Sequence, residues 1–399
     1  MDIRQQVLDR AHAYRNYTAQ NLSEMVKIPS FSGKEEEVCK KIKHLCEEAG
    51  FDTVRIDGLG SVVARVGYGP KTMAFDAHID TVEVGDPGQW NLDPFSGLIK
   101  DGQVYGRGSA DQKGGAASMI TAGRILKEME YRGTHSVYFT FTVMEEDCDG
   151  LCWKYLIEEE KLVPDYFVST EPTSCQLYHG HRGRMEIVCT LKGVSCHGSA
   201  PERGVNVGYK AARAALAMER LNEDLQPDDD GFLGKGTVVV SQIDVHGPSQ
   251  CAVPDEGMMY LDRRLTWGED AELAIRQVKE YMGSDVETVK MPRYTKRGYK
   301  NADYGQDLYF PTWKIPADHP LVLAGVGTYQ DLYGEKPVKD RWIFSTNAVA
   351  VCGRHKIPSI GFGPGDEVQA HAPNEMNRVD DLEICSAFYA LLPYTLDRI

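Results

Sequence analysis

The chain has 399 residues, of which 26% are charged, and a formal net charge of −15 at pH 7. Because nucleic acids and acidic membranes are also negatively charged, this balance argues against either as a partner. At about 100–200 residues per domain, the length predicts two domains, or three.

The N-terminus predicts an amphipathic helix and not a secretion signal, because charge begins at Asp2 and no apolar core follows. No apolar run approaches the ~20 residues that a membrane-spanning helix needs. The ten cysteines include no C-x-x-C pair, and Cys148 and Cys152 come closest. We therefore expect a cytoplasmic protein with free thiols, most of them buried.

Strand patterns alternate with helical patterns through the first and last parts of the chain. The expected strands are 61–67, 72–78, 136–144, 165–170 and 357–363, and the clearest helices are 114–130 and 150–161. This alternation predicts an α/β fold with a mixed, mostly parallel sheet and helices on both faces.

The middle of the chain has a different order of elements. Strands are expected at 183–194, 236–247, 256–267 and 285–292, with helices at 206–224 and 269–283. The order β-α-β-β-α-β is that of a ferredoxin-like α+β unit. We therefore predict one domain made of residues 1–182 and 300–399, and a second domain, residues 183–299, inserted into it.

Several acidic and imidazole side chains stand where the predicted strands end. The strand 72–78 ends on His78, and the others are Asp80, Asp111, Glu145, Glu146, Glu171 and His371. A single strand-end Asp is more often a turn or helix cap. Ligands of open parallel sheets, however, bind beyond the carboxyl ends of the strands, so the whole set should converge in space.

Two histidines and several carboxylates are the ligands that a pair of zinc ions or similar divalent metals prefers. The adjacent Glu145 and Glu146 cannot both point the same way. One can bind metal, while the other stays free to take a proton from water activated by the ions.

The order His-x-Asp, Asp, Glu-Glu, Glu, His resembles a family of co-catalytic zinc hydrolases in peptidase clan MH. This family includes aminoacylases, acetylornithine deacetylases, succinyl-diaminopimelate desuccinylases and carboxypeptidase G2, and the resemblance covers essentially the whole chain. The stretches "STEPTSCQLYHGHRGRMEI", "GVSCHGSAPERG", "LDRRLTWGE" and "GFGPG" are similar to a bacterial subgroup of selenium-metabolism-linked hydrolases. The resemblance implies a zinc-exopeptidase-like catalytic domain and an inserted lid or dimerisation domain.

The resemblance also implies roles for the clustered residues. Asp111 would bridge two divalent ions, expected to be zinc, with cobalt or manganese as alternatives. His78 and Glu171 would complete one site, and Glu146 and His371 the other.

Three further features near the ions follow from the same resemblance. Asp80 would hydrogen-bond the far ring nitrogen of His78 and fix its tautomer. Glu145 would be the general base, carrying a proton from water to the leaving nitrogen. The peptide bond Asp111–Gln112 would be cis.

The inserted domain carries the family pattern G-x-x-x-H-x-x-x-P-x-x-G, which places His197 as a catalytic residue. In dimeric relatives this histidine reaches the partner's active site, where it would steady the oxyanion of the intermediate. A strand-end histidine with a structural partner is the alternative. The neighbouring Cys196 could be a nucleophile, but no base is placed for it.

Substrate-binding roles are implied for Arg264, Gly363 and Asn347. Arg264 matches the family's D-x-R position and would pair with a substrate carboxylate, although a local salt bridge is the alternative. Gly363 would let the backbone approach the substrate, unless it only forms a turn. Asn347 stands where relatives often have Asp.

Cys251 replaces a common Asn in "CAVPD". Arg182 and Arg184 flank Gly183 at the predicted domain boundary. They could meet an anionic substrate or remain exposed hinge charges.

We therefore expect a metal-dependent amidohydrolase acting on a small substrate that carries a carboxylate. It would cleave an N-acyl or N-carbamoyl amide, or release a C-terminal amino acid. In relatives, Glu at the position of Glu171 goes with deacylases and carboxypeptidases. A dipeptidase or aminopeptidase on the same fold is the first alternative, and a non-catalytic metal- or metabolite-binding protein is the second. The relatives also imply a homodimer.

Overall fold

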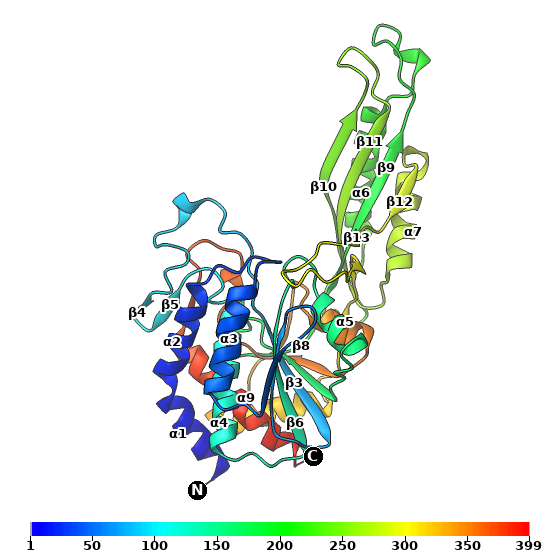
Figure 1. Cartoon of the computed structure of the whole chain (residues 1–399). Coiled ribbons are helices and arrows are strands. Elements are labelled where there is room, and N and C mark those ends of the chain that lie inside the picture. The colour runs from blue at the N-terminus through cyan, green and yellow to red at the C-terminus, as the bar shows by residue number, and fades with distance from the viewer. Residues whose placement is uncertain (1, 399) are drawn as a thin grey trace.

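The computed structural model describes residues 2–398, which form a large unit and an elongated projection (Figure 1). Within these residues, the large unit contains a nine-stranded sheet in the order β1-β2-β6-β3-β7-β18-β8-β16, with β17 also paired to β8. Its strands are β1 (Thr53–Ile56), β2 (Val62–Val66), β3 (Lys71–His78), β6 (His135–Thr142), β7 (Tyr166–Ser169), β8 (Leu177–His181), β16 (Trp313–Lys314), β17 (Lys339–Trp342) and β18 (Ser359–Gly361).

The centre of the sheet is parallel and its flanks are antiparallel. Strands β6, β3, β7 and β18 run parallel to one another. Strands β1 and β2 on one side, and β8 and β16 on the other, join antiparallel. The predicted mixed, mostly parallel α/β sheet is therefore confirmed.

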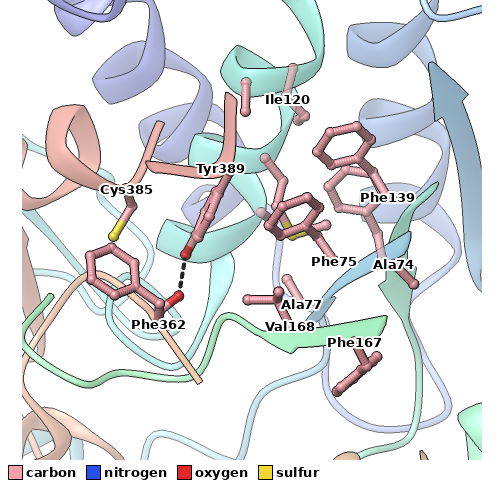
Figure 2. Close-up of a cluster of buried hydrophobic side chains, with 14 of the residues drawn as sticks. Ala74, Phe75, Ala77, Ile120, Phe139, Phe167, Val168, Phe362, Cys385 and Tyr389 are labelled. Carbon is pink, nitrogen blue, oxygen red and sulfur yellow. Dashed lines mark hydrogen bonds between the residues drawn. The ribbon is translucent and has the colours of Figure 1, made fainter. Parts of the chain in front are cut away.

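Helices cover both faces of this sheet, because successive strand residues point to opposite sides. On one face, Phe75 of β3 stacks on Phe139 and contacts Tyr389, whose hydroxyl donates to the carbonyl of Phe362 at 2.6 Å (Figure 2). On the other face, Phe167 of β7 meets Trp153 edge-on at 4.9 Å. The helices of the large unit are α1 (Ile3–Ala13), α2 (Arg15–Val26), α3 (Glu36–Glu48), α4 (Lys113–Glu128), α5 (Leu151–Glu158), α8 (Pro320–Tyr333), α9 (Val379–Leu396) and a π-helical turn at Val349–Arg354.

The projection, which we call the arm, has its own sheet and its own apolar core. The strand order β10-β11-β9-β12 and the antiparallel pairing match the predicted ferredoxin-like unit. The arm comprises β9 (Gly183–Lys192), α6 (Val207–Asp224), β10 (Thr237–His246), β11 (Glu256–Leu265), α7 (Ala271–Met282) and β12 (Thr288–Lys290).

The chain crosses between the large unit and the arm twice. It leaves after β8 at His181 and returns after β12, because Tyr294, Tyr299 and Tyr304 pack against the core of the large unit. β15 (Tyr309–Phe310) then pairs with the base of β9. We propose that these crossings delimit the two predicted domains, residues 1–182 with 300–399 and residues 183–299. The remaining strands are β4 (Ile99–Lys100), β5 (Gln103–Tyr105), β13 (Arg293–Tyr294), β14 (Gln306–Asp307) and β19 (Met376–Arg378). No helix among residues 2–398 combines the length and apolarity needed to cross a bilayer.

Candidate metal centre

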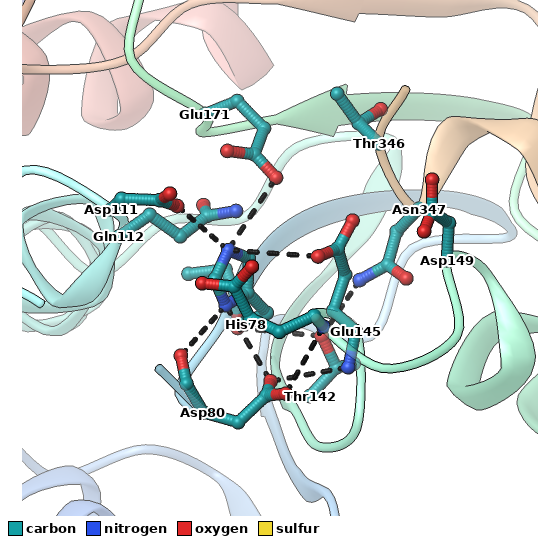
Figure 3. A network of polar contacts seen from close by, with 12 residues as sticks. His78, Asp80, Asp111, Gln112, Thr142, Glu145, Asp149, Glu171, Thr346 and Asn347 are labelled. Atoms are coloured by element: carbon teal, nitrogen blue, oxygen red, sulfur yellow. Dashed lines mark hydrogen bonds and ion pairs between the residues drawn. The ribbon is translucent and has the colours of Figure 1, made fainter. Parts of the chain in front are cut away.

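The predicted metal ligands meet at the carboxyl ends of the parallel strands. His78 is the last residue of β3, Glu146 follows β6, and Glu171 follows β7. Asp111 precedes α4, and His371 lies in the loop between β18 and β19. All five, together with Glu145, line one cavity of about 280 Å³. Figure 3 shows His78, Asp111, Glu145 and Glu171 of this set.

The side chains form two ligand groups that share Asp111. His78 Nε2 lies 2.9 Å from Asp111 Oδ1 and 3.7 Å from Glu171 Oε1. His371 Nε2 lies 3.4 Å from Asp111 Oδ2 and 2.9 Å from Glu146 Oε2. Tetrahedral ligands bound at 2.0–2.1 Å lie about 3.3 Å apart, so both groups fit a cation. Asp111 presents one oxygen to each group, as a bridging ligand must.

The charge balance of the cavity also favours cations. The side chains of Asp111, Glu145, Glu146 and Glu171 are between 4% and 10% exposed. Burial raises the pKa of Glu145 and Glu171 well above the usual range, and that of Glu146 to about 7. Burial lowers the pKa of His78, but the charges of Glu145 and Glu171 outweigh it and leave the pKa raised. Two divalent ions would offset this excess of negative charge.

Asp80 contacts His78 differently from the prediction. His78 Nδ1 bonds to the main-chain oxygen of Asp80 at 3.0 Å, whereas the nearest carboxylate oxygen of Asp80 is 3.5 Å away. That carboxylate instead accepts hydrogen bonds from the main-chain N–H groups of Glu145 (3.2 Å) and Glu146 (3.1 Å), and from the hydroxyl of Ser32 (2.6 Å). Asp80 thus orients His78 through its backbone and the Glu-Glu pair through its side chain.

Glu145 lies beside the ligands without a strong partner of its own. Its Oε2 is 3.9 Å from His78 Nε2, and with His78 and Glu171 it forms a group compact enough to hold an ion. The neighbouring peptide bond Asp111–Gln112 is cis, as the resemblance implies.

Two arginines from the base of the arm line the same cavity. Arg184 and Arg264 are directly opposite each other on β9 and β11. Arg264 donates two hydrogen bonds to Asp262, at 2.8 and 3.1 Å, so the alternative local salt bridge is present as well. Arg184 lies 3.3 Å from Asp149, a cavity residue that the sequence did not single out. Arg182 donates to the main-chain oxygens of Lys235 and Ile343.

The other two predicted substrate contacts do not line the cavity. Asn347 is 2% exposed, and its amide donates to Asp76 and Thr142 and accepts from the N–H of Gly150. A side-chain carbon at Gly363 would lie 2.1 Å from the main-chain oxygen of Glu171. Asn347 therefore ties core elements together, and Gly363 permits close packing against the Glu171 loop; their substrate-binding roles stay predictions.

His197 also lies outside the cavity. It follows the ten-residue strand β9, which starts at the crossing from the large unit, so it stands about 30 Å along the arm. Its ring is exposed and contacts Ser199 Oγ at 2.7 Å. Within one chain, His197 and the ligand groups are therefore far apart.

The fold and the paired ligand groups are those of a metal-dependent hydrolase of amide or peptide bonds. Residues 74–394 match Peptidase family M20/M25/M40, and the chain belongs to this family.

Relatives support this assignment along the whole chain. The uncharacterized protein YgeY of Escherichia coli strain K12 is 46% identical over 97% of this chain and 96% of its own length. A succinyl-diaminopimelate desuccinylase of Magnetococcus marinus is 28% identical over 88% of this chain and 90% of its own. The resemblance to the selenium-linked subgroup stays a prediction.

Solved structures share the fold. The aminopeptidase PepT of Bacillus cereus superposes with a TM-score of 0.74 at 21% identity, covering 96% of this chain and 98% of its own. The dipeptidase Dug1p of Saccharomyces cerevisiae gives 0.74 at 14% identity, covering 100% and 99%.

Proposed function

We propose that the protein hydrolyses an N-acyl or N-carbamoyl amide, or releases a C-terminal amino acid, from a small substrate that bears a carboxylate. The observation that carries this proposal is the position of Glu145. It is a buried carboxylate that lies 3.9 Å from His78, and neither of the two ligand groups that share Asp111 uses it. A spare acid at that place suits a general base.

The chain's own residues would share the work as follows. Asp111, His78 and Glu171 hold one divalent cation, and Asp111, Glu146 and His371 hold the other. When bound, the cations polarise the amide carbonyl and make water more acidic. Glu145 takes the proton of that water and delivers it to the leaving nitrogen. Zinc suits these nitrogen and oxygen ligands, with cobalt and manganese as alternatives.

The substrate's carboxylate would be bound at the base of the arm. Arg264 lines the cavity on the side of the arm, and a guanidinium can pair with a carboxylate through two hydrogen bonds. Binding there would require Arg264 to exchange its contact with Asp262 for the substrate. Glu171, which in relatives accompanies deacylases and carboxypeptidases, supports the same substrate class, as does the relative named a desuccinylase.

A dipeptidase or aminopeptidase is the second candidate. Asp149 and Arg184 stand side by side on the cavity wall, so the wall offers opposite charges to a free amino group and a free carboxylate. The structures of PepT and Dug1p, named as an aminopeptidase and a dipeptidase, share the fold.

We further propose a homodimer in which His197 serves the partner's site. The edge strand β10 and helix α6 border a groove, and Leu216, Val239 and Ile243 along it are 57%, 54% and 43% exposed. An apolar edge strand invites pairing with a second copy about a two-fold axis. The cytoplasmic location stays a prediction.

The test is a substrate panel with the metal-loaded and the chelated protein. We expect hydrolysis of N-acyl or N-carbamoyl amino acids, loss on chelation, and recovery with zinc, cobalt or manganese. Free dipeptides as the better substrates would select the second candidate. Undiminished turnover after the metal has been stripped would refute the proposed mechanism.

A further inference from the structure

A buried glutamate behind the metal centre accepts four hydrogen bonds from the loop that carries Asp111. Glu375 is fully buried, four residues after His371 in the chain. Its Oε1 accepts from the N–H groups of Ala110 (2.8 Å) and Asp111 (3.0 Å). Its Oε2 accepts from the N–H of Gly108 (3.0 Å) and from Arg107 Nη1 (2.8 Å).

Arg107 extends this contact to the loop that carries His371. The side chain is 3% exposed, and it packs against the ring of Trp90 at 5.2 Å. Nη1 also donates to the main-chain oxygen of Ala372 at 3.2 Å. Nη2 donates to the main-chain oxygen of His371 at 3.4 Å. Glu375 and Arg107 therefore join the loops of two ligands without lining the cavity themselves.

The two histidines differ in how firmly the fold holds them. His78 ends a buried strand, and its side chain is 2% exposed. His371 lies in a loop, its side chain is 56% exposed, and its φ is +61°. The ligand group of His371 therefore has more need of outside support, because ligands must be held within about 0.5 Å of their working positions.

We propose that Glu375 is a positioning residue which, together with Arg107, sets the places of Asp111 and His371 and so controls binding of the cation held by Asp111, Glu146 and His371. This inference rests on the two-cation centre of the proposed function. Outer hydrogen-bond partners of metal ligands commonly change affinity by 10–100-fold when they are replaced.

The requirement is for an acid and not merely for a polar group of this shape. A carboxylate has only acceptor oxygens, and here they face four donors. In Glu375→Gln, one oxygen becomes an N–H₂ group that points at a donor, either at Arg107 and Gly108 or at Ala110 and Asp111. The near-isosteric variant therefore breaks about half of the hydrogen bonds while it preserves the packing.

A matched control lies at the opposite end of the large sheet. Asp397 is also a carboxylate that accepts several donors, among them the N–H of Thr134 at 2.9 Å and His135 Nδ1 at 2.8 Å. His135 begins β6, whereas the metal centre lies past its other end. Asp397→Asn should therefore reduce stability without affecting cation binding.

The experiment is a stepwise titration of the full-length, chelator-stripped protein with Zn²⁺ or Co²⁺, in which calorimetry measures the affinity of each site. We expect Glu375→Gln to weaken the site of Asp111, Glu146 and His371 10–100-fold. The affinity of the site that contains His78 and Glu171 should stay within about threefold of wild type. Hydrogen exchange should rise in 107–112 and 371–375 in Glu375→Gln and not in Asp397→Asn. Arg107→Lys, which keeps the charge but loses the bond to His371, should give a smaller weakening of the same site.

Unchanged affinities in folded Glu375→Gln, or an equal loss at both sites, would overturn the proposal. If Glu375→Gln does not fold, Arg107→Lys is the test variant, and unchanged affinities or an equal loss at both sites would again overturn the proposal. The readout needs no turnover, so an inactive wild type that binds two cations would defeat the proposed reaction and leave this inference standing. A wild type that binds fewer than two would defeat the proposed centre.

Discussion

The large unit and the arm use histidine in opposite settings. In the large unit, His78 ends a buried parallel strand and meets four carboxylates at the carboxyl edge of the sheet. In the arm, His197 is exposed beyond the end of a long strand, where its ring contacts the hydroxyl of Ser199. The contrast indicates that the large unit gathers charged side chains around the metal centre, whereas the arm carries a histidine far from that centre. Four predictions test these two roles separately.

The largest effect is expected in the large unit. Glu145→Gln should lower kcat by at least about 10³-fold and leave both cations bound, because the amide cannot accept the proton but keeps the shape. Metal analysis and steady-state kinetics check both points. Normal turnover by this variant would remove Glu145 from the mechanism.

The second-largest effect is expected at His197, which should act only in the active site of the partner subunit. His197→Ala should lower kcat by about 10²–10³-fold, the usual loss for one oxyanion donor. Mixing it with Glu145→Gln should restore roughly a quarter of wild-type activity, because half of randomly formed dimers are mixed and each has one intact site. If the mixture gains nothing, the arm does not act on its partner.

The crossing between the two regions should respond to pH. His181, the last residue of β8, is buried, and burial lowers its pKa to about 4. Its Nδ1 bonds to the oxygen of Arg182 at 2.8 Å, and its Nε2 accepts from the N–H of Thr346. The folded state therefore binds this proton less readily than the unfolded chain, whose His pKa is about 6.5.

The neutral form of His181 therefore contributes about 3 kcal/mol to the free energy of unfolding above pH 6.5, and this contribution is lost as the pH falls towards 4. His181→Gln, whose side chain does not titrate, should lack this loss. Denaturant unfolding of both proteins in chelator at pH 7, 5.5 and 4 gives the comparison. Parallel pH curves for the two proteins would contradict the assignment.

The smallest effect is expected at the base of the arm. Arg264→Gln should raise KM about 30-fold for a substrate with a carboxylate, equivalent to about 2 kcal/mol for hydrogen bonds to a charged group. For the same substrate with its carboxylate converted to an amide, wild type and Arg264→Gln should have similar KM values. Equal KM values for both substrates in wild type would place the carboxylate elsewhere.

The sequence predicted the elements and the convergence of the candidate ligands, because both depend on local pattern plus one rule of topology. Strand 72–78 is visible from its apolar run, and the rule that parallel strands share a carboxyl edge brings His78, Glu146 and Glu171 together. The ferredoxin-like order of the arm was also readable, because its strands and helices alternate with distinct periods.

The contacts that escaped prediction join residues distant in the chain through single hydrogen bonds. The carboxylate of Asp80 turned out to hold the backbone of Glu145, and the amide of Asn347 to fill a gap among Asp76, Thr142 and Gly150. Glu375 gave no signal, since a lone Glu in "HAPNE" looks like an exposed loop acid. No periodicity encodes such pairings, which depend on where loops come to rest.

The carboxylate of Asp80 also couples the positions of the two adjacent glutamates. One of its oxygens holds the backbone of Glu145 and the other that of Glu146. A shift of this carboxylate would therefore move Glu145 and the candidate ligand Glu146 together, so the two neighbours cannot be repositioned independently.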